Sequence, residues 1–178
     1  MRFPALVLLA FAASVALAAD PPKPAPAAAF PAARLPGASL EEVLKAFPSA
    51  RETEERCLHE AVAKARIFCT RFTARQGNLG YHLELSKAGR LIRSTEYVIL
   101  PNAAEAERVY RSRVAALTKA MGKGKESKAA PSAGLTELRT SWVDKPAKLQ
   151  RSGVILLTKA NEPAMVLDYL ETHDPKQF

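Results

Sequence analysis

The chain has 178 residues, a formal net charge of +8 and a hydrophobic content of 48%. This length leaves room for one domain with a sizeable core. The basic charge bears on partners rather than on the fold, and it favours phospholipid head groups, acidic glycans or an acidic protein.

The first 18 residues are typical of a secretory signal peptide. Arg2 precedes an apolar stretch that ends at Ala19, and Ala16-Leu17-Ala18 is a small-x-small cleavage signal. This stretch is alanine-rich and shorter than the roughly 20 strongly apolar residues of a membrane helix, and no cysteine for lipid attachment ends it. We expect cleavage near Ala18 or Ala19, which removes only Arg2 and lowers the charge from +8 to +7. The mature protein is then periplasmic or secreted.

Residues 19–37 are so rich in proline and alanine that they predict a disordered linker, followed by a single α+β domain over residues 38–178. The domain opens on Ser39-Leu-Glu-Glu42, a capping box that begins a short helix. Pro48 ends this helix, whose apolar face follows helical spacing: Leu40, Val43, Leu44 and Phe47. Residues 49–65 fit either a second short helix or an irregular segment.

Three strand-like runs follow from Arg66, separated by turn signals at residues 76–78 and 87–89. They predict a three-stranded antiparallel meander. The middle run alternates apolar and polar residues and therefore has one buried face, formed by Leu79, Tyr81, Leu83 and Leu85.

A second, longer helix is predicted after Asn102, which caps it together with Glu105. Its apolar stripe consists of Tyr110, Val114, Leu117 and Met121. Residues 122–134 have the composition of a flexible basic loop. Three more strand-like runs occupy residues 135–143, 152–159 and 163–171.

The two halves of the chain resemble each other. Four pairs of segments keep their order at offsets of 70 to 74 residues, and they begin at Leu44 and Thr118, Cys69 and Arg139, Leu83 and Ile155, and Glu96 and Asp168. The alternative is chance similarity between short apolar strands. We expect a duplicated helix-then-three-stranded antiparallel meander, with repeat 1 over about residues 38–100, repeat 2 over about residues 101–171, and the helices packed on one face of the sheet.

The chain contains two cysteines, Cys57 and Cys69. In an oxidising compartment they predict a disulfide bond. A nucleophile or metal site that combines them with His59 is the alternative, but no fourth ligand has zinc-like spacing.

Motifs that would place a nucleophile, a general base or a phosphate are absent from the sequence, including G-x-S-x-G, H-E-x-x-H and S-x-x-K. The three histidines fall in separate predicted elements. Strand alternation favours water-facing positions for the carboxylates that could serve catalysis, which are Glu84, Glu96 and Asp168. We therefore expect no catalytic residues, no metal and no cofactor.

Two sets of residues could bind a partner. Four aromatic residues occupy repeat-related strand positions and would anchor a protein if exposed, with core packing as the alternative: Phe72, Tyr97, Trp142 and Tyr169. A basic strip could bind an anionic lipid or glycan: Arg108, Arg111, Lys119, Lys123, Lys125 and Lys128. Nucleic acid is not expected as a partner.

The Ser39-Leu-Glu-Glu-Val43 opening after Gly37, with the meander behind it, resembles two groups of small exported proteins. These are the beta-lactamase-inhibitor-protein type and the small outer-membrane assembly lipoproteins, which use helix-then-three-strand units. The resemblance is one of outline, without a specific motif, and the lipoprotein cysteine is missing. It implies an open sheet face that binds an unidentified envelope protein without catalysis, as an inhibitor-like module would. An envelope protein that binds anionic lipid or glycan is the alternative.

Overall fold

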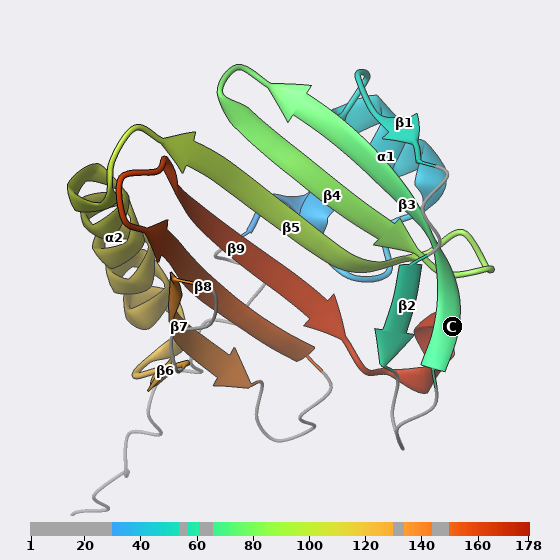
Figure 1. The fold of residues 1–178 in the computed structure, drawn as a ribbon. Coiled ribbons are helices and arrows are strands. Elements are labelled where there is room, and N and C mark those ends of the chain that lie inside the picture. The colour runs from blue at the N-terminus through green and yellow to red at the C-terminus, as the bar shows by residue number, and fades with distance from the viewer. Residues whose placement is uncertain (1–29, 54–56, 61–65, 130–133, 144–149) are drawn as a thin grey trace, which may run out of the picture.

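A computed structural model describes residues 30–53, 57–60, 66–129, 134–143 and 150–178 (Figure 1). The predicted signal peptide and residues 19–29 of the predicted linker lie outside these ranges. Within them, no helix is long and apolar enough to cross a membrane.

The fold is α+β, as predicted, with a large antiparallel sheet and two α-helices in the described ranges. The helical segments are η2 (Ala32–Arg34), α1 (Leu40–Ala46), α2 (Ala103–Met121) and η4 (Pro175–Gln177). The strands are β1 (Arg51–Glu52), β2 (Cys57–Glu60), β3 (Arg66–Gln76), β4 (Leu79–Leu85), β5 (Leu91–Leu100), β6 (Lys125–Lys128), β7 (Leu135–Val143), β8 (Gln150–Lys159) and β9 (Ala164–Thr172).

The strands follow one another in the order β1-β3-β4-β5-β9-β8-β7-β6, and β2 also pairs with β3. Each of these pairings is antiparallel. The two predicted meanders, β3-β4-β5 and β7-β8-β9, are thus joined edge to edge by the pairing of β5 with β9. This central pairing runs from Arg93 opposite Glu171 to Leu100 opposite Ala164.

Both α-helices begin where their capping residues predict. The Ser39 hydroxyl accepts a hydrogen bond from the Glu42 N–H, and the Glu42 carboxylate accepts one from the Ser39 N–H, so the capping box is complete. At α2, Asn102 Oδ1 accepts a hydrogen bond from the Glu105 N–H at 2.9 Å. The helices therefore start at positions that the sequence alone identifies.

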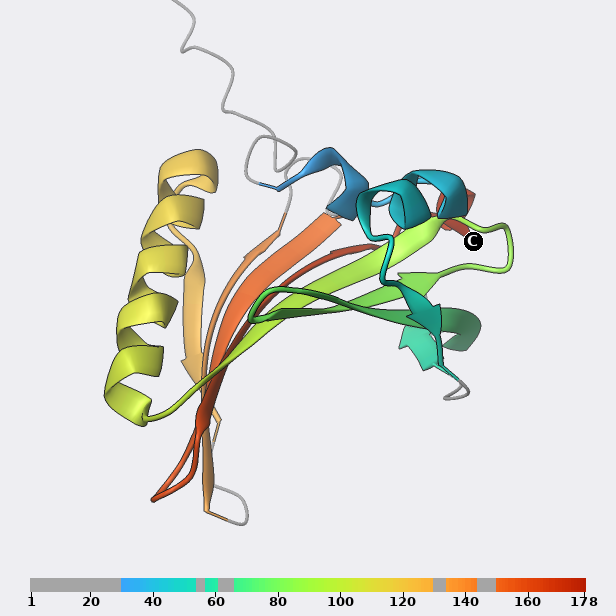
Figure 2. The same ribbon diagram turned by 90° about the horizontal axis from the view of Figure 1, so that it is seen from above.

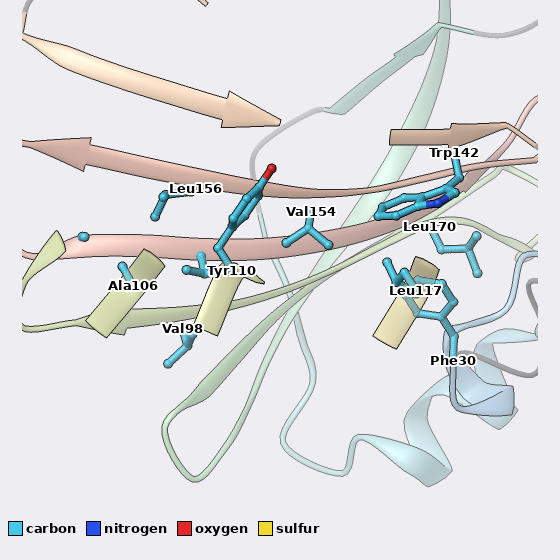
Figure 3. Packing of buried hydrophobic residues seen from close by; sticks show 11 residues of the cluster. Phe30, Val98, Ala106, Tyr110, Leu117, Trp142, Val154, Leu156 and Leu170 are labelled. Atoms are coloured by element: carbon cyan, nitrogen blue, oxygen red, sulfur yellow. The ribbon is translucent and has the colours of Figure 1, made fainter. Parts of the chain in front are cut away.

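Two groups of buried apolar residues make up the core. The first joins α2 to β5, β7, β8 and β9, and its members include Tyr110, Leu117, Trp142, Val154, Val166 and Leu170 (Figure 3). The second joins α1 to β3, β4 and the start of β5, with Val43, Phe47, Tyr81, Leu83 and Leu91 among its members. Burying a large apolar side chain stabilises the fold by about 1.5–3 kcal/mol. These clusters therefore hold both helices against the sheet.

Figure 2 shows α1, α2 and η2 on the same side of the sheet, which we call the covered face. Side chains alternate between the two faces along a strand. Since Val98 and Val166 belong to the cluster under α2, their neighbours Tyr97 and Leu167 point to the other side. We call that side the open face.

The structure corrects three expectations about segments. In the described parts of residues 49–65, which are 49–53 and 57–60, the chain forms the strands β1 and β2 and no helix. The predicted loop at residues 122–134 contains β6, a fully exposed strand at the sheet edge. Lysines are common on such edges because they discourage further pairing, which explains why the composition suggested a loop.

The third correction concerns the predicted linker at residues 19–37, because its C-terminal part is packed against the domain. Phe30 is 7% exposed and belongs to the first core cluster. Arg34 is 3% exposed. Backbone hydrogen bonds of 2.8 Å then tie Gly37 and Ala38 to Leu91. The packed chain thus includes residue 30 and does not begin near Ala38.

Candidate partner-binding face

The open face is the region where the sequence-predicted partner-binding residues can meet a partner. Its side chains form rows that run across the strands, because antiparallel register places paired residues side by side. Two of these rows and one pair of aromatic residues define the open face. The apolar row is Ile99, Met165 and Leu157, and the charge row is Arg71, Glu84, Arg93, Glu171 and Arg151. The tyrosine pair is Tyr97 and Tyr169, which lie diagonally on β5 and β9, because Tyr97 is opposite Leu167 and Tyr169 is opposite Thr95.

The charge row crosses β3, β4, β5, β9 and β8 with alternating signs. Arg71 Nη2 lies 3.0 Å from Glu84 Oε1, and Arg93 Nε lies 3.8 Å from Glu171 Oε2. His173 Nε2 is 3.4 Å from Glu171 Oε1. Opposite charges on adjacent strands attract, so this row stabilises the pairing of strands across the middle of the sheet.

Tyr97 sits on β5 directly opposite Gly80 of β4. Its ring lies over that glycine, since a Cβ atom at Gly80 would be 2.2 Å from Tyr97 Cζ. The His82 ring contacts its edge, with ring centroids 5.1 Å apart. Tyr97 is partly exposed, so the far side of its ring is available to a partner.

Tyr169 sits in the same way on β9, opposite Gly153 of β8. A Cβ atom at Gly153 would be 2.6 Å from Tyr169 Cε1. The Arg93 guanidinium carbon lies 5.4 Å from the centroid of the Tyr169 ring. Only 6% of Tyr169 is exposed. Burial, with the nearby Glu171 carboxylate, raises the pKa of the Tyr169 phenol. Tyr169 therefore forms the floor of the face rather than a projecting anchor.

The apolar row is the most accessible hydrophobic part of the open face. Ile99 is 55% exposed, and it lies opposite Met165, which in turn lies opposite Leu157. Leu135 at the start of β7 is also 41% exposed. Large apolar side chains gathered on a surface are a common mark of a binding site.

The other two predicted anchors lie on the covered face. Trp142 is 6% exposed in the core under α2, and its Nε1 donates a hydrogen bond of 2.7 Å to the Gly122 carbonyl oxygen. Phe72 packs against the core cluster under α1. For these two residues the structure agrees with core packing, the other reading of the sequence pattern, and not with partner binding. The structure does not bring all four aromatic residues together.

The predicted basic strip is divided between the outer side of α2, the segment after it and β6. The six residues are exposed: Arg108, Arg111, Lys119, Lys123, Lys125 and Lys128. Arg111 Nη2 lies 2.6 Å from Glu107 Oε1, and this hydrogen bond raises the pKa of Arg111. The negatively charged Glu107 on α2 and Glu126 on β6 lie among these basic residues, so the strip is not uniformly positive.

Sequence reasoning missed a cluster of four charged residues on the covered face. Arg34 Nη1 lies 3.1 Å from Glu96 Oε2, and Arg34 Nη2 contacts Asp168 Oδ1. Arg113 of α2 approaches the same two carboxylates, at 2.8 Å each. The expectation that Glu96 and Asp168 face water is therefore wrong.

Glu84 also departs from that expectation, because it is only 6% exposed in its ion pair with Arg71. Each of the three carboxylates is thus matched by an arginine. In the sequence, the only feature that linked Glu96 with Asp168 was their equivalent position in the two predicted repeats.

The cysteine-containing strands place the two cysteines side by side. In the β2–β3 pairing, Cys57 and Cys69 are Cα partners. Directly opposite residues in antiparallel strands have Cα atoms about 4.5–5.5 Å apart, which suits a disulfide. In the described part of the chain, no group of three or more histidine, cysteine or acidic residues could hold a metal ion.

Comparisons of this chain with protein-family models, with curated proteins and with solved structures found no match. The physical description of the open face is therefore the basis for assigning a function.

Proposed function

We propose that this protein is an exported, non-enzymatic protein-binding module of the cell envelope, and that a partner protein binds its open face. The observation that carries the proposal is the exposure of Ile99, at 55%, beside the partly exposed ring of Tyr97 on the central strand β5. Export follows from the signal-peptide pattern of residues 1–18 and gives a periplasmic or secreted protein. An inhibitor-like role fits the same surface.

The composition of the open face supports binding. Protein interfaces commonly have an apolar, aromatic centre and a charged rim. Here the apolar row and Tyr97 lie together, and the charge row borders them on one side. Rigid aromatic anchors lose little conformational entropy on binding, and Tyr97 is already held by Gly80 and His82.

We further propose that the domain is a tandem duplication of a helix and three strands, with both helices on the covered face. The register of the central strands supports this. Glu96 and Asp168, equivalent at an offset of 72 residues, are direct partners in the β5–β9 pairing. A twofold rotation axis that passes between Glu96 and Asp168 would superpose one half of the domain on the other.

The tyrosine pair supports duplication independently. Gly80 and Tyr97 are cross-strand partners in the first meander, as Gly153 and Tyr169 are in the second. In both, the aromatic ring covers its glycine so closely that a Cβ atom would clash. The same unusual packing at matched positions is hard to reconcile with chance similarity of short apolar strands.

The test of the binding function is an affinity purification of the mature protein from envelope extract, with crosslinking and mass spectrometry at low and high salt. We expect wild type to recover one protein at both salts, and Ile99→Ser with Tyr97→Ala to lose it. The matched control is Leu44→Ser, which also removes an exposed aliphatic side chain, but on α1.

Equal recovery by all variants would rule out the open face as the binding site. Recovery of anionic lipid alone, removed by salt, would favour the basic strip instead.

A further inference from the structure

We propose that the partner presents an acidic surface to the open face, with apolar side chains on the apolar row and carboxylates at Arg75 and Arg151. This inference rests on the proposed function and specifies the chemistry of the partner. The two arginines lie on opposite sides of the tyrosine pair. Arg75 is on β3 opposite Gly80, and Arg151 is on β8 opposite Glu171.

The balance of charge on the open face supports an acidic partner. In the described ranges, each of its three glutamates has an arginine: Glu84 pairs with Arg71, Glu171 with Arg93, and Glu137 with Arg139 at 2.8 Å. Arg51, opposite Thr73, donates hydrogen bonds to the Pro48 and Ala50 carbonyl oxygens. Two further arginines remain. Arg75 and Arg151 are exposed, and neither forms an ion pair with another residue in the described ranges.

A second copy of the chain does not fit this face. Each copy would bring a net charge of +8, or +7 after signal-peptide cleavage, and the same two unmatched arginines. Like charges brought together across an interface are costly, and complementary charges steer association. The occupant should therefore carry carboxylates.

A membrane surface fits less well than a protein. The charge row alternates in sign, so the partly exposed Glu171 would face a uniformly anionic lipid surface as well. A protein can match alternating charges residue by residue. The apolar row also crosses three strands, which suits a partner element lying across the strand direction.

The experiment starts by placing a benzophenone amino acid at position 99 and irradiating the exported protein in envelope extract. The crosslinked protein and its attached segment are identified by mass spectrometry. That protein is then purified, and its affinity for the full chain is measured at low and high salt. The variants are Arg75→Glu with Arg151→Glu, and Tyr97→Ala.

The matched control is Arg108→Glu with Lys119→Glu, which changes the net charge equally but on α2. We expect an attached segment that contains Asp or Glu beside apolar residues. We expect the open-face charge reversal to weaken binding about tenfold at low salt, with a smaller effect at high salt, and the control pair to change it less than about twofold.

An attached segment without carboxylates, or an affinity that survives the charge reversal while Tyr97→Ala abolishes binding, would overturn the acidic-partner inference and leave the proposed function standing. If no variant on the open face changes the affinity, the proposed function itself fails. Binding to phosphatidylglycerol vesicles that depends on Arg75 and Arg151, without any protein crosslink, would overturn the inference in favour of a membrane.

Discussion

Glu96 and Asp168 face each other across the β5–β9 pairing and share the same two arginines, Arg34 and Arg113. One arginine comes from the segment before α1 and the other from α2. Two positive and two negative charges therefore balance at the centre of the covered face. Buried ion pairs of this kind are sensitive to the loss of one partner, because the remaining charge is left without compensation.

We predict that Arg34→Ala lowers the free energy of unfolding by about 3 kcal/mol. The Arg34 side chain is only 4% exposed, and its removal leaves Arg113 as the remaining arginine that pairs with both carboxylates. Urea titration measures the effect. The control is Arg111→Ala, whose side chain is 69% exposed and whose loss should leave the urea midpoint nearly unchanged. Similar costs for both variants would contradict the cluster described here.

A second prediction concerns the glycines under the tyrosine pair. Gly153→Ala should destabilise the fold by about 2 kcal/mol, because the buried Tyr169 ring has little room to move. Gly80→Ala should cost less, because the Tyr97 ring is partly exposed and can swing outward. Thermal melts of both variants measure this. In a Tyr169→Ala background, Gly153→Ala should have little effect, and an unchanged penalty there would show that the ring is not the cause.

A third prediction is the Cys57–Cys69 disulfide. Peptide mapping without reduction should recover the two cysteines in one crosslinked peptide. Cys57→Ser with Cys69→Ser should lower stability by about 3 kcal/mol, as expected for closing a short loop. A reducing agent should destabilise wild type but not this double variant. Two free thiols in the exported protein would contradict the prediction.

The fourth prediction is a loss of stability at alkaline pH. Burial raises the pKa of Tyr169, and burial also raises the pKa of Tyr110 beneath α2. A raised folded-state pKa favours the neutral phenol in the fold. Its contribution to stability is therefore fully present below the unfolded value near about pH 10 and is lost as pH rises through the folded value. Urea midpoints between pH 9 and 11.5 should fall less steeply for Tyr169→Phe than for wild type; parallel curves would argue against a buried phenol.

The sequence was most informative where short-range rules decide the structure. Ser39 and Asn102 predicted both helix starts, and period-two alternation predicted that Tyr81 and Leu83 of β4 are buried. These features depend on residues a few positions apart. The strands of both meanders could be predicted from the sequence for the same reason.

Long-range pairing could not be predicted in this way. Arg34 meets Glu96 and Asp168 across separations of 62 and 134 residues, and nothing in a Pro/Ala-rich segment signals a buried arginine. The sequence also did not decide to which face of the sheet Tyr97 points, because apolar residues occur on both sides of its strand. The position of its neighbour Val98 in the core cluster under α2 places Tyr97 on the open face.

The pairing of β5 with β9 also bears on how the chain folds. β3-β4-β5 and β7-β8-β9 are local meanders, whereas β5 meets β9 only after some 70 residues have been added, since Glu96 lies opposite Asp168. Contacts between distant segments form slowly because the intervening chain must first be closed into a loop. A chain that emerges N-terminus first therefore holds β5 as an uncovered sheet edge until β9 arrives. An apolar strand exposed in this way can pair with other molecules, so the interval before β9 joins is the period of greatest risk of aggregation.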